Sequence, residues 1–280
     1  NDTLRIFAIG ASTTEQIYVD DKETWSSLLQ LRLEDDGVQN VEVINTGVSG
    51  LRARQMYATQ QYVEAFYPDY MIILAGVNDW NKHIAPSFHE NDYSITDSVL
   101  FIAAQNLYNF LSGRYYEYYD KKFKVYDGNA HVRQAKRRAS APTISLFIDD
   151  VSSDYKEWIT KIANNCDQGE YSCMFVTQPS AYNPEISKEL SNKLWMTPPR
   201  ATYKYSVSSM LHVSRTYNEW LTDFAESRNL NICDAASQLP ATTQVFFDDV
   251  HFNENGSRLI SNIIYKCLLD TLPQPNVLTK

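Results

Sequence analysis

Glycine, long apolar runs and basic residues are all scarce in this sequence. Only 9 of the 280 residues are glycine, which excludes collagen-like and linker-dominated architectures. No apolar run approaches the roughly 18 residues that span a bilayer, and the longest, residues 70–75, has the length of a buried strand. Lys and Arg total 25 against 34 Asp and Glu, a net charge of −9. That balance argues against a nucleic-acid partner, because phosphates need a basic surface.

Cysteine is also scarce. The four cysteines include no C-x-x-C pair, so neither a zinc ribbon nor a dithiol redox motif is indicated. A chain of this length does not need disulfides to be stable, so we expect buried thiols. Cys166 and Cys173 are the pair that we would expect to bond if any pair does.

Several catalytic motifs are missing as well. The sequence has no P-loop and no H-E-x-x-H, the signatures of phosphate-binding enzymes and zinc peptidases. The five histidines are too scattered to suggest a metal cluster, so we expect neither a metal nor an organic cofactor. The nucleophile elbow G-x-S-x-G of α/β-hydrolases is not matched either, because Thr14 occupies its last position.

What the sequence does have is an alternation of strand and helix patterns. Short apolar runs predict strands at residues 4–9, 41–45, 70–75, 173–177 and 231–234. Apolar residues at helical spacing predict helices at 24–34, 53–66, 153–164, 207–228 and 259–268. Repeated strand–helix units indicate an α/β fold in which helices cover both faces of a parallel sheet.

Residues 82–150 interrupt this rhythm. They include a possible helix at 97–111 and a stretch at 114–138 rich in Lys and Arg. We interpret the segment as an insertion after the third strand, within one domain that spans the whole chain. The basic stretch could contact an anionic polymer or lipid headgroup, but a solvated loop is the simpler interpretation and the one we favour.

Polar residues capable of ester chemistry follow the predicted strands, where sites lie in open α/β sheets. Ser12 follows the first strand and is the candidate nucleophile. His251, just before the last helix, is the candidate base, and Asp248 is the candidate group that orients it. The backbone N–H groups of Ser12 and Gly50 and the side-chain amide of Asn78 could stabilise an oxyanion. Each residue alone has a simpler interpretation, such as a helix cap for Ser12 or a turn for Gly50.

Asp248 has an acidic neighbour, Asp249, and only one of the two can orient His251. Side chains three residues apart in a helical turn lie on the same face, whereas those two apart do not. We therefore expect Asp248 to reach the imidazole. Asp249 should point away, toward solvent or the start of the last helix.

Together these blocks resemble the SGNH (GDSL-type) hydrolases, a family named for a serine, a glycine, an asparagine and a histidine. The matching blocks are G-x-S at Ser12, N-x-G-x-S-G at Gly50, G-x-N-D at Asn78 and D-x-x-H from Asp248 to His251. They occur in the family order and cover nearly the whole chain. Ala11 stands where the family usually has Asp. This difference bears on which substrate subgroup the chain resembles more than on the reaction chemistry, because that Asp is not one of the three catalytic residues.

The resemblance implies a three-layer α/β/α sandwich with a five-stranded parallel sheet in flavodoxin-like order. It also implies a serine esterase that acts through an acyl-enzyme. The stretch from Arg5 to Glu15 is similar to bacterial members that read RIF-x-x-G-x-STT. Those members are often extracytoplasmic with an N-terminal membrane anchor, which would lie outside this chain that begins at Asn1.

An aromatic stretch at residues 178–205 follows the fourth strand and should border the cleft. Within it we expect Trp195 and Tyr182 to bind substrate and to govern which ester is chosen, while packing against the insertion is an equally simple role. The expected substrate is an O-acyl ester, acetyl among the candidates, on a carbohydrate or lipid. An O-acyltransferase with the same residues, or a non-catalytic glycan- or lipid-binding module, remains an alternative. Neither the substrate nor the oligomeric state can be read from the sequence.

Overall fold

Five parallel strands form the central sheet of the protein, here a computed structural model that describes residues 3–85, 135–136, 138–195 and 203–272. In the order β2-β1-β3-β5-β7, they are β2 (Val41–Asn45), β1 (Leu4–Gly10), β3 (Tyr70–Leu74), β5 (Ser172–Val176) and β7 (Asn231–Cys233). Each neighbouring pair is parallel. The predicted three-layer fold and its strand order are confirmed.

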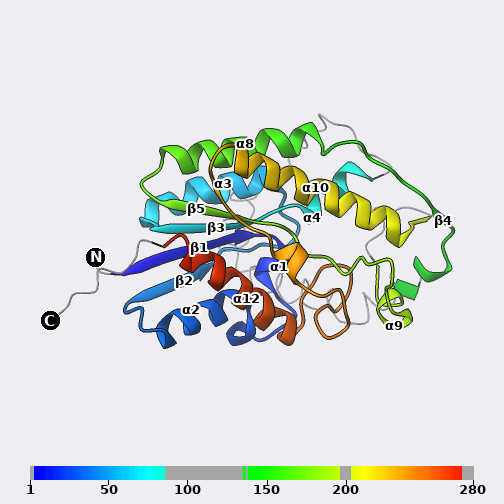
Figure 1. The fold of residues 1–280 in the computed structure, drawn as a ribbon, viewed down its shortest axis with the longest axis horizontal. Helices are drawn as coiled ribbons and strands as arrows, with labels where there is room; N and C mark the ends of the chain where they lie inside the picture. The colour runs from blue at the N-terminus through cyan, green and yellow to red at the C-terminus, as the bar shows by residue number, and fades with distance from the viewer. Residues whose placement is uncertain (1–2, 86–134, 137, 196–202, 273–280) are drawn as a thin grey trace, which may run out of the picture.

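Helices cover both faces of this sheet (Figure 1). One face carries α2 (Trp25–Asp35) and α12 (Glu254–Leu269), which pack against each other. The other face carries α3 (Ala53–Val63), α8 (Ser153–Gln168) and α10 (Val207–Ser227). With helices on both sides, the central strands are shielded from water, and every residue of β3 is buried. This explains why a central strand such as β3 has a continuous apolar run and not an alternating pattern.

The helices begin where polar side chains can satisfy free backbone N–H groups. Thr24 accepts from the N–H of Ser27 at the start of α2, and Ser206 accepts from that of Ser209 at the start of α10. Asn253 accepts from the N–H of Gly256 at the start of α12, at 2.9 Å. These caps fix the starts of the helices that flank the carboxyl ends of the strands.

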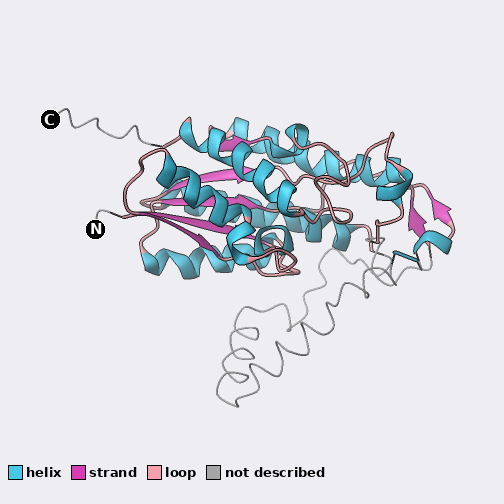
Figure 2. Ribbon diagram, turned by 90° about the horizontal axis from the view of Figure 1, so that it is seen from below, coloured by secondary structure: helices cyan, strands magenta, loops and turns pink. Residues whose placement is uncertain are grey.

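A second, two-stranded parallel sheet joins β4 (Thr143–Ile144) to β6 (Lys204–Tyr205). It lies at one end of the molecule, away from the five-stranded sheet (Figure 2). The sequence did not predict it, because two-residue strands leave no periodic pattern. The possible helix at 97–111 and nearly all of the basic stretch lie outside the described residues, as does most of the predicted insertion at about 82–150.

The expectation of buried thiols is wrong, because the four cysteines form two disulfides. One joins Cys166 of α8 to Cys173 of β5, the pair favoured from the sequence, with Cα atoms 5.8 Å apart. The other joins Cys233 of β7 to Cys267 of α12, at 5.7 Å. The apolar helix face that predicted a buried Cys267 also packs it against β7 and so brings its sulfur to Cys233.

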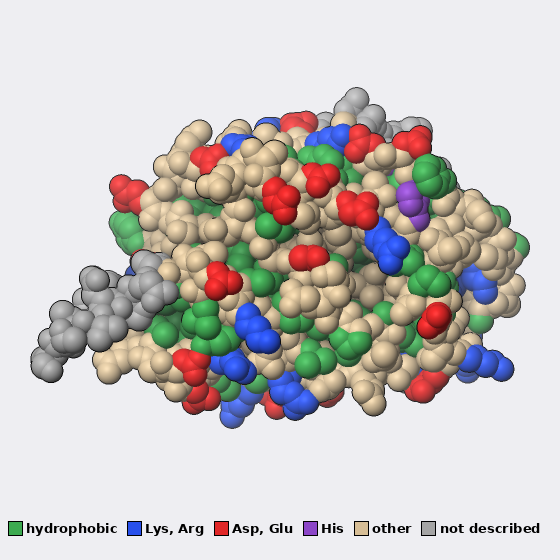
Figure 3. Space-filling view, viewed as in Figure 1, with side chains coloured by type: hydrophobic (Ala, Val, Ile, Leu, Met, Phe, Trp, Pro, Cys, Tyr) green, Lys and Arg blue, Asp and Glu red, His purple; other side chains and the backbone are tan. Residues whose placement is uncertain are grey.

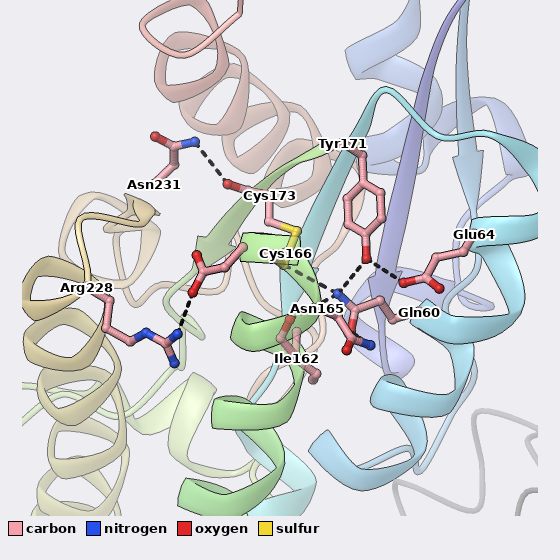
Figure 4. Close-up of a disulfide and its surroundings, with 10 residues drawn as sticks. Gln60, Glu64, Ile162, Asn165, Cys166, Tyr171, Cys173, Arg228 and Asn231 are labelled. Atoms are coloured by element: carbon pink, nitrogen blue, oxygen red, sulfur yellow. Dashed lines mark hydrogen bonds and ion pairs between the residues drawn. A yellow bond between two sulfur atoms is a disulfide. The ribbon is translucent and has the colours of Figure 1, made fainter. Parts of the chain in front are cut away.

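The first disulfide lies within a polar network (Figure 4). The Gln60 side chain donates to the carbonyl of Ile162 at 3.1 Å and to the hydroxyl of Tyr171 at 3.3 Å. Tyr171 in turn donates to Glu64 at 2.6 Å. The disulfide and these bonds link α3 to α8 and to the start of β5, at the end of the sheet opposite the predicted site.

Candidate active site

Ser12 is the first residue of a short helix, α1 (Ser12–Glu15), that begins directly after β1. The turn into this helix is tight. A Cβ atom at Gly10 would lie 2.1 Å from Thr14 Oγ1 and 3.1 Å from the carbonyl oxygen of Leu74. Glycine therefore allows the chain to leave the sheet at this point, and the Ser12 side chain is left half-buried at the carboxyl end of the strand.

Gln16 fixes this short helix to its surroundings. Its backbone adopts the left-handed conformation, with φ 54°, and ends α1. Its buried side chain accepts from the N–H of Trp25 at 2.5 Å and donates to Ser257 Oγ at 2.6 Å. Because these partners belong to α2 and α12, Ser12 stands on a rigid support.

Ser12, His251 and Asp248 form a continuous hydrogen-bonded chain. The Oγ of Ser12 lies 2.8 Å from Nε2 of His251. On the other side of the ring, Nδ1 lies 2.8 Å from Asp248 Oδ2 and 3.0 Å from Oδ1. With the proton on Nδ1, the imidazole donates to the carboxylate, and Nε2 is left to accept the serine proton. We refer to this set as the Ser12–His251–Asp248 chain.

The Asp248 carboxylate also shapes the turn that carries His251. Its Oδ1 accepts from the backbone N–H groups of Val250 and His251, both at 3.0 Å. Burial by itself would raise the pKa of Asp248. The charge of His251 and the hydrogen bonds from its ring and from the two backbone groups outweigh this effect and lower the pKa to about 2. The carboxylate is therefore ionised at neutral pH.

The pKa of His251 is shifted in the opposite direction. Burial alone would lower it, but the charge and hydrogen bond of Asp248, together with the charges of Asp249 and Glu15, raise it above its ordinary value. The imidazolium form of His251 is thus stabilised by three nearby carboxylates.

Asp249 does not point toward solvent, so that expectation is wrong. Its side chain is fully buried and accepts from the Tyr182 hydroxyl at 3.0 Å and from the Trp195 backbone N–H at 2.7 Å. Its own carbonyl accepts from the N–H of Ala181 at 2.8 Å. The loop after β5 covers this carboxylate and supplies its partners, which a helical-turn argument confined to residues 248–251 could not show.

The side chains of Trp195 and Tyr182, the two residues expected to bind substrate, each donate to one of the adjacent acids Asp248 and Asp249. Tyr182 is only 3% exposed, and its hydroxyl is bound to Asp249, so the structure gives it a supporting contact rather than an open position for substrate. Trp195 is half-buried, and its indole N–H donates to Asp248 Oδ2 at 2.6 Å. Its ring lies parallel to the imidazole of His251, with 6.4 Å between centroids.

A second aromatic residue beside the imidazole, Tyr18, was not singled out in the sequence. The ring of Tyr18 meets His251 edge-on, with centroids 5.2 Å apart, and Phe247 lies 6.2 Å beyond Tyr18. Tyr18 follows the G-x-S block by only a few residues, and this proximity was the available signal.

The loop that carries Gly50 lies against the same short helix. Gly47 allows this approach, since a Cβ there would lie 2.3 Å from the backbone nitrogen of Glu15. Glu15 holds the next turn, accepting from both the backbone N–H and the hydroxyl of Ser49. Gly50 has φ +86°, in the left-handed region, with open space around its missing side chain. Its backbone conformation, rather than crowding, is what favours glycine there.

Asn78 and Asp79 hold this loop from the other side, at the start of α4 (Val77–His83). Asn78 Nδ2 donates to the carbonyl of Leu51 at 2.9 Å, which uses one of its two amide hydrogens. Both carboxylate oxygens of Asp79 lie 3.2 Å from the backbone nitrogen of Ala53, the first residue of α3. Burial is the main cause that raises the pKa of Asp79 to about 7; the Ala53 N–H and Arg52 oppose it, and Asp154 adds to it.

A separate cavity of about 630 Å³ lies between the loop after β5 and α10. Tyr182 lines it together with Arg215, Glu219 and Asp223. Acidic side chains gather on the face of the molecule that carries α10 (Figure 3). Neither Ser12 nor His251 lines this cavity, so it is distinct from the Ser12–His251–Asp248 chain.

Within the described parts of the chain, no three His, Cys, Asp or Glu side chains are grouped so that they could hold a metal ion. No described helix has the length and apolar character required to cross a membrane. The arrangement at Ser12 can instead activate a hydroxyl group, because a buried carboxylate orients an imidazole whose other nitrogen accepts from that hydroxyl.

Comparison with known proteins relates this geometry to one family. Residues 8–259 match the model of the GDSL-like lipase/acylhydrolase family. The match covers all four sequence blocks. No curated protein is similar enough in sequence to be counted as a relative.

Solved structures share the fold at low sequence identity. TesA superposes with a TM-score of 0.56 at 12% identity, covering 96% of this chain and 99% of its own. The acetyl xylan esterase AlAXEase gives 0.53 at 14%, covering 95% and 100%. The psychrotrophic esterase EstA from Pseudoalteromonas sp., solved with monoethylphosphonate as inhibitor, gives 0.50 at 12%, covering 95% and 97%.

Proposed function

The chain belongs to the GDSL-like lipase/acylhydrolase family of ester-hydrolysing enzymes, and we propose that it is a serine esterase that removes an O-acyl group through an acyl-enzyme. The observation that carries this proposal is the 2.8 Å contact between Ser12 Oγ and His251 Nε2, with Asp248 on the opposite ring nitrogen. A nucleophile, its base and the group that orients the base are all within hydrogen-bond reach.

In the first half-reaction, Ser12 Oγ attacks the ester carbonyl carbon while His251 Nε2 takes the serine proton. The imidazolium that forms lies against ionised Asp248, which holds its orientation and balances its charge. When the tetrahedral intermediate collapses, the C–O bond to the alcohol breaks, and His251 passes its proton to the leaving oxygen. The acyl group is then an ester of Ser12.

In the second half-reaction, a water molecule replaces the alcohol. His251 takes a proton from this water as its oxygen attacks the acyl carbon, and then returns a proton to Ser12 Oγ as the carboxylic acid leaves. In both halves the negative charge appears on the former carbonyl oxygen. The backbone N–H groups of Ser12 and Gly50 and the second amide hydrogen of Asn78 are the proposed donors to it.

Removal of one such donor typically costs about 3 kcal/mol of barrier, or roughly a hundredfold in rate. The donors must therefore be held in place. The bonds from Asn78 to Leu51 and from Asp79 to Ala53 fix the loop that presents Gly50. This supports a role for all three donors in one site.

The proposed substrate is an O-acyl ester, acetyl among the candidates, of a carbohydrate or lipid alcohol. The alcohol leaves on the side of His251, since that residue protonates it. The ring of Tyr18 lies beside the imidazole, with Phe247 beyond it, and aromatic rings can pack on the apolar face of a sugar or on an alkyl chain. One structural neighbour is an acetyl xylan esterase, which agrees with a short acyl group.

We further propose an extracytoplasmic location, with any membrane anchor outside this chain. Two disulfides support this proposal, because such bonds persist mainly in oxidising compartments. A net charge of −9 supports the expectation that nucleic acid is not a partner.

The test is a hydrolysis screen with p-nitrophenyl esters of graded chain length alongside acetylated polysaccharides, run in parallel with Ser12→Ala. Turnover by the wild type and its loss in Ser12→Ala are the expected results. If the acyl group appears on an added sugar acceptor and not as free acid, the enzyme is an acyltransferase. Absence of turnover on every activated ester would refute a catalytic role.

A further inference from the structure

The two oxygens of Asp248 share the His251 ring but differ in their other donors. Oδ1 lies 3.0 Å from the ring Nδ1 and also accepts from the backbone N–H groups of Val250 and His251, which belong to its own turn. Oδ2 accepts from only two described groups, the His251 ring at 2.8 Å and the indole N–H of Trp195 at 2.6 Å. The torsion that turns an aspartate carboxylate is broad and only weakly restrained by itself. The hydrogen bond from the Trp195 indole therefore holds the Asp248 carboxylate in the orientation in which Oδ2 accepts from the His251 ring.

Trp195 is itself held by Asp249, the fully buried neighbour of Asp248. The backbone N–H of Trp195 donates to Asp249 Oδ2 at 2.7 Å, and the Tyr182 hydroxyl donates to Oδ1 at 3.0 Å. Adjacent acids therefore play complementary parts: Asp248 contacts the imidazole, and Asp249 anchors the loop whose tryptophan contacts Asp248.

We propose that Trp195 is a positioning residue for the Asp248 carboxylate, and that Asp249 sets the position of Trp195. This inference rests on the proposed function, since it assigns Trp195 to the Ser12–His251–Asp248 chain and not to substrate recognition. Trp195 acts through its hydrogen bond to Asp248 and does not take part in bond making.

The decisive variant is Trp195→Phe, which keeps an aromatic ring beside His251 and removes the N–H donor. A hydrogen bond to a charged group typically has an effect large enough to lower kcat by at least about tenfold when it is lost. KM for a small activated ester such as p-nitrophenyl acetate should change less than about threefold, because a positioning role adds no substrate contact.

A second readout does not depend on turnover. Once the indole no longer shares the Asp248 charge, more of that charge faces His251 and favours the imidazolium. The pKa of His251, followed by NMR of labelled histidine, should rise in Trp195→Phe relative to the wild type. The other charged groups near the ring, Asp249 and Glu15, are unchanged in this variant.

Trp158 offers a matched control. Its indole N–H also donates to an aspartate, Asp154, at 3.0 Å, but on α8. Trp158→Phe removes the same kind of bond and should leave kcat and the His251 titration unchanged. Circular dichroism and melting temperature establish that both variants fold.

The coupling to Asp249 is tested by a double-mutant cycle. If Asp249 acts through Trp195, Asp249→Asn lowers kcat in the wild type but adds little in the Trp195→Phe background. Should Trp195→Phe fail to fold, the indole N–H resonance of Trp195 in the wild type and in Asp248→Asn answers the same question. It should move with the Asp248 change, whereas that of Trp158 should not.

The inference is overturned if Trp195→Phe leaves kcat and the His251 pKa unchanged, or if its only effect is a higher KM. An equal loss in Trp158→Phe would overturn it too, because the effect would then be general. Failure of the proposed function gives a different result, because the wild type itself would then hydrolyse no ester. The two NMR measurements would still report on the hydrogen bond between Trp195 and Asp248.

Discussion

Asp248 and Asp249 are adjacent in the chain, and both are buried, yet their carboxylates face different partners. Asp248 accepts from the imidazole of His251, whereas Asp249 accepts from the loop after β5 through Tyr182 and Trp195. Asp248 is thus placed to serve the proposed reaction, whereas Asp249 holds the loop after β5 beside it.

Asp248→Asn should lower kcat by at least about a hundredfold, because loss of the orienting carboxylate leaves the base in the wrong tautomer. Asp249→Asn should have the smaller effect on kcat and should instead lower the free energy of unfolding by about 1–3 kcal/mol, since buried donors lose an acceptor. The measurements are kcat on one activated ester and urea denaturation of both variants. If Asp249→Asn is the more damaging for kcat, the assignment of Asp248 is wrong.

The pH profile of kcat/KM should rise with pH, with a midpoint above 6.5. The three neighbouring carboxylates raise the pKa of His251 above that ordinary value, so the ring stays protonated, and unable to act as a base, to higher pH. Glu15→Gln removes one of these charges and should move the midpoint downward. A wild-type midpoint at or below 6.5 would contradict this electrostatic account.

Asp79 should make stability depend on pH in the sense opposite to that of most carboxylates. Its pKa rises from 3.8 to about 7 on folding, so its stabilising contribution is present below 3.8 and is lost as pH rises through about 7. Asp79→Asn cannot ionise and keeps an oxygen for the Ala53 N–H. The melting temperature of this variant, relative to that of the wild type, should therefore increase between about pH 4 and pH 8. A constant difference across this range would show that Asp79 is already ionised in the fold.

The two disulfides should contribute unequally to stability. Cys233 and Cys267 are 34 positions apart and Cys166 and Cys173 only 7 apart. On the chain-entropy model the longer loop is worth about 4 kcal/mol and the shorter about 2.5 kcal/mol. Urea denaturation of the two paired Cys→Ala variants measures the difference. Greater loss from the Cys166→Ala/Cys173→Ala variant would point to native-state contacts, such as those of Gln60, as the main contribution.

Much of the fold and the core of the site could be predicted from sequence. Alternating strand and helix patterns predict the three layers, because the spacing of apolar residues within each element indicates which of its residues are buried. Ser12, Asp248 and His251 could be assigned because each follows a strand or precedes a helix, and the strands bring their carboxyl ends to one edge.

The remaining features depend on contacts between distant segments. Trp195 lies 53 positions from Asp248, in a stretch with no period that would indicate which way its indole points. The burial of Asp249, which was expected to face solvent, depends on the same loop. The Cys233–Cys267 disulfide likewise requires β7 and α12 to lie side by side. The apolar pattern of each element predicts that it is buried but does not show that it packs against the other.

The central claim is that Ser12 is the nucleophile, and covalent labelling tests it most directly. The enzyme is treated with a fluorophosphonate, its intact mass is measured, and the modified peptide is mapped. One adduct on Ser12 is predicted for the wild type, with no adduct in Ser12→Ala and slower labelling in His251→Ala, which lacks the base. An adduct on another serine, or one that persists in Ser12→Ala, would contradict the account.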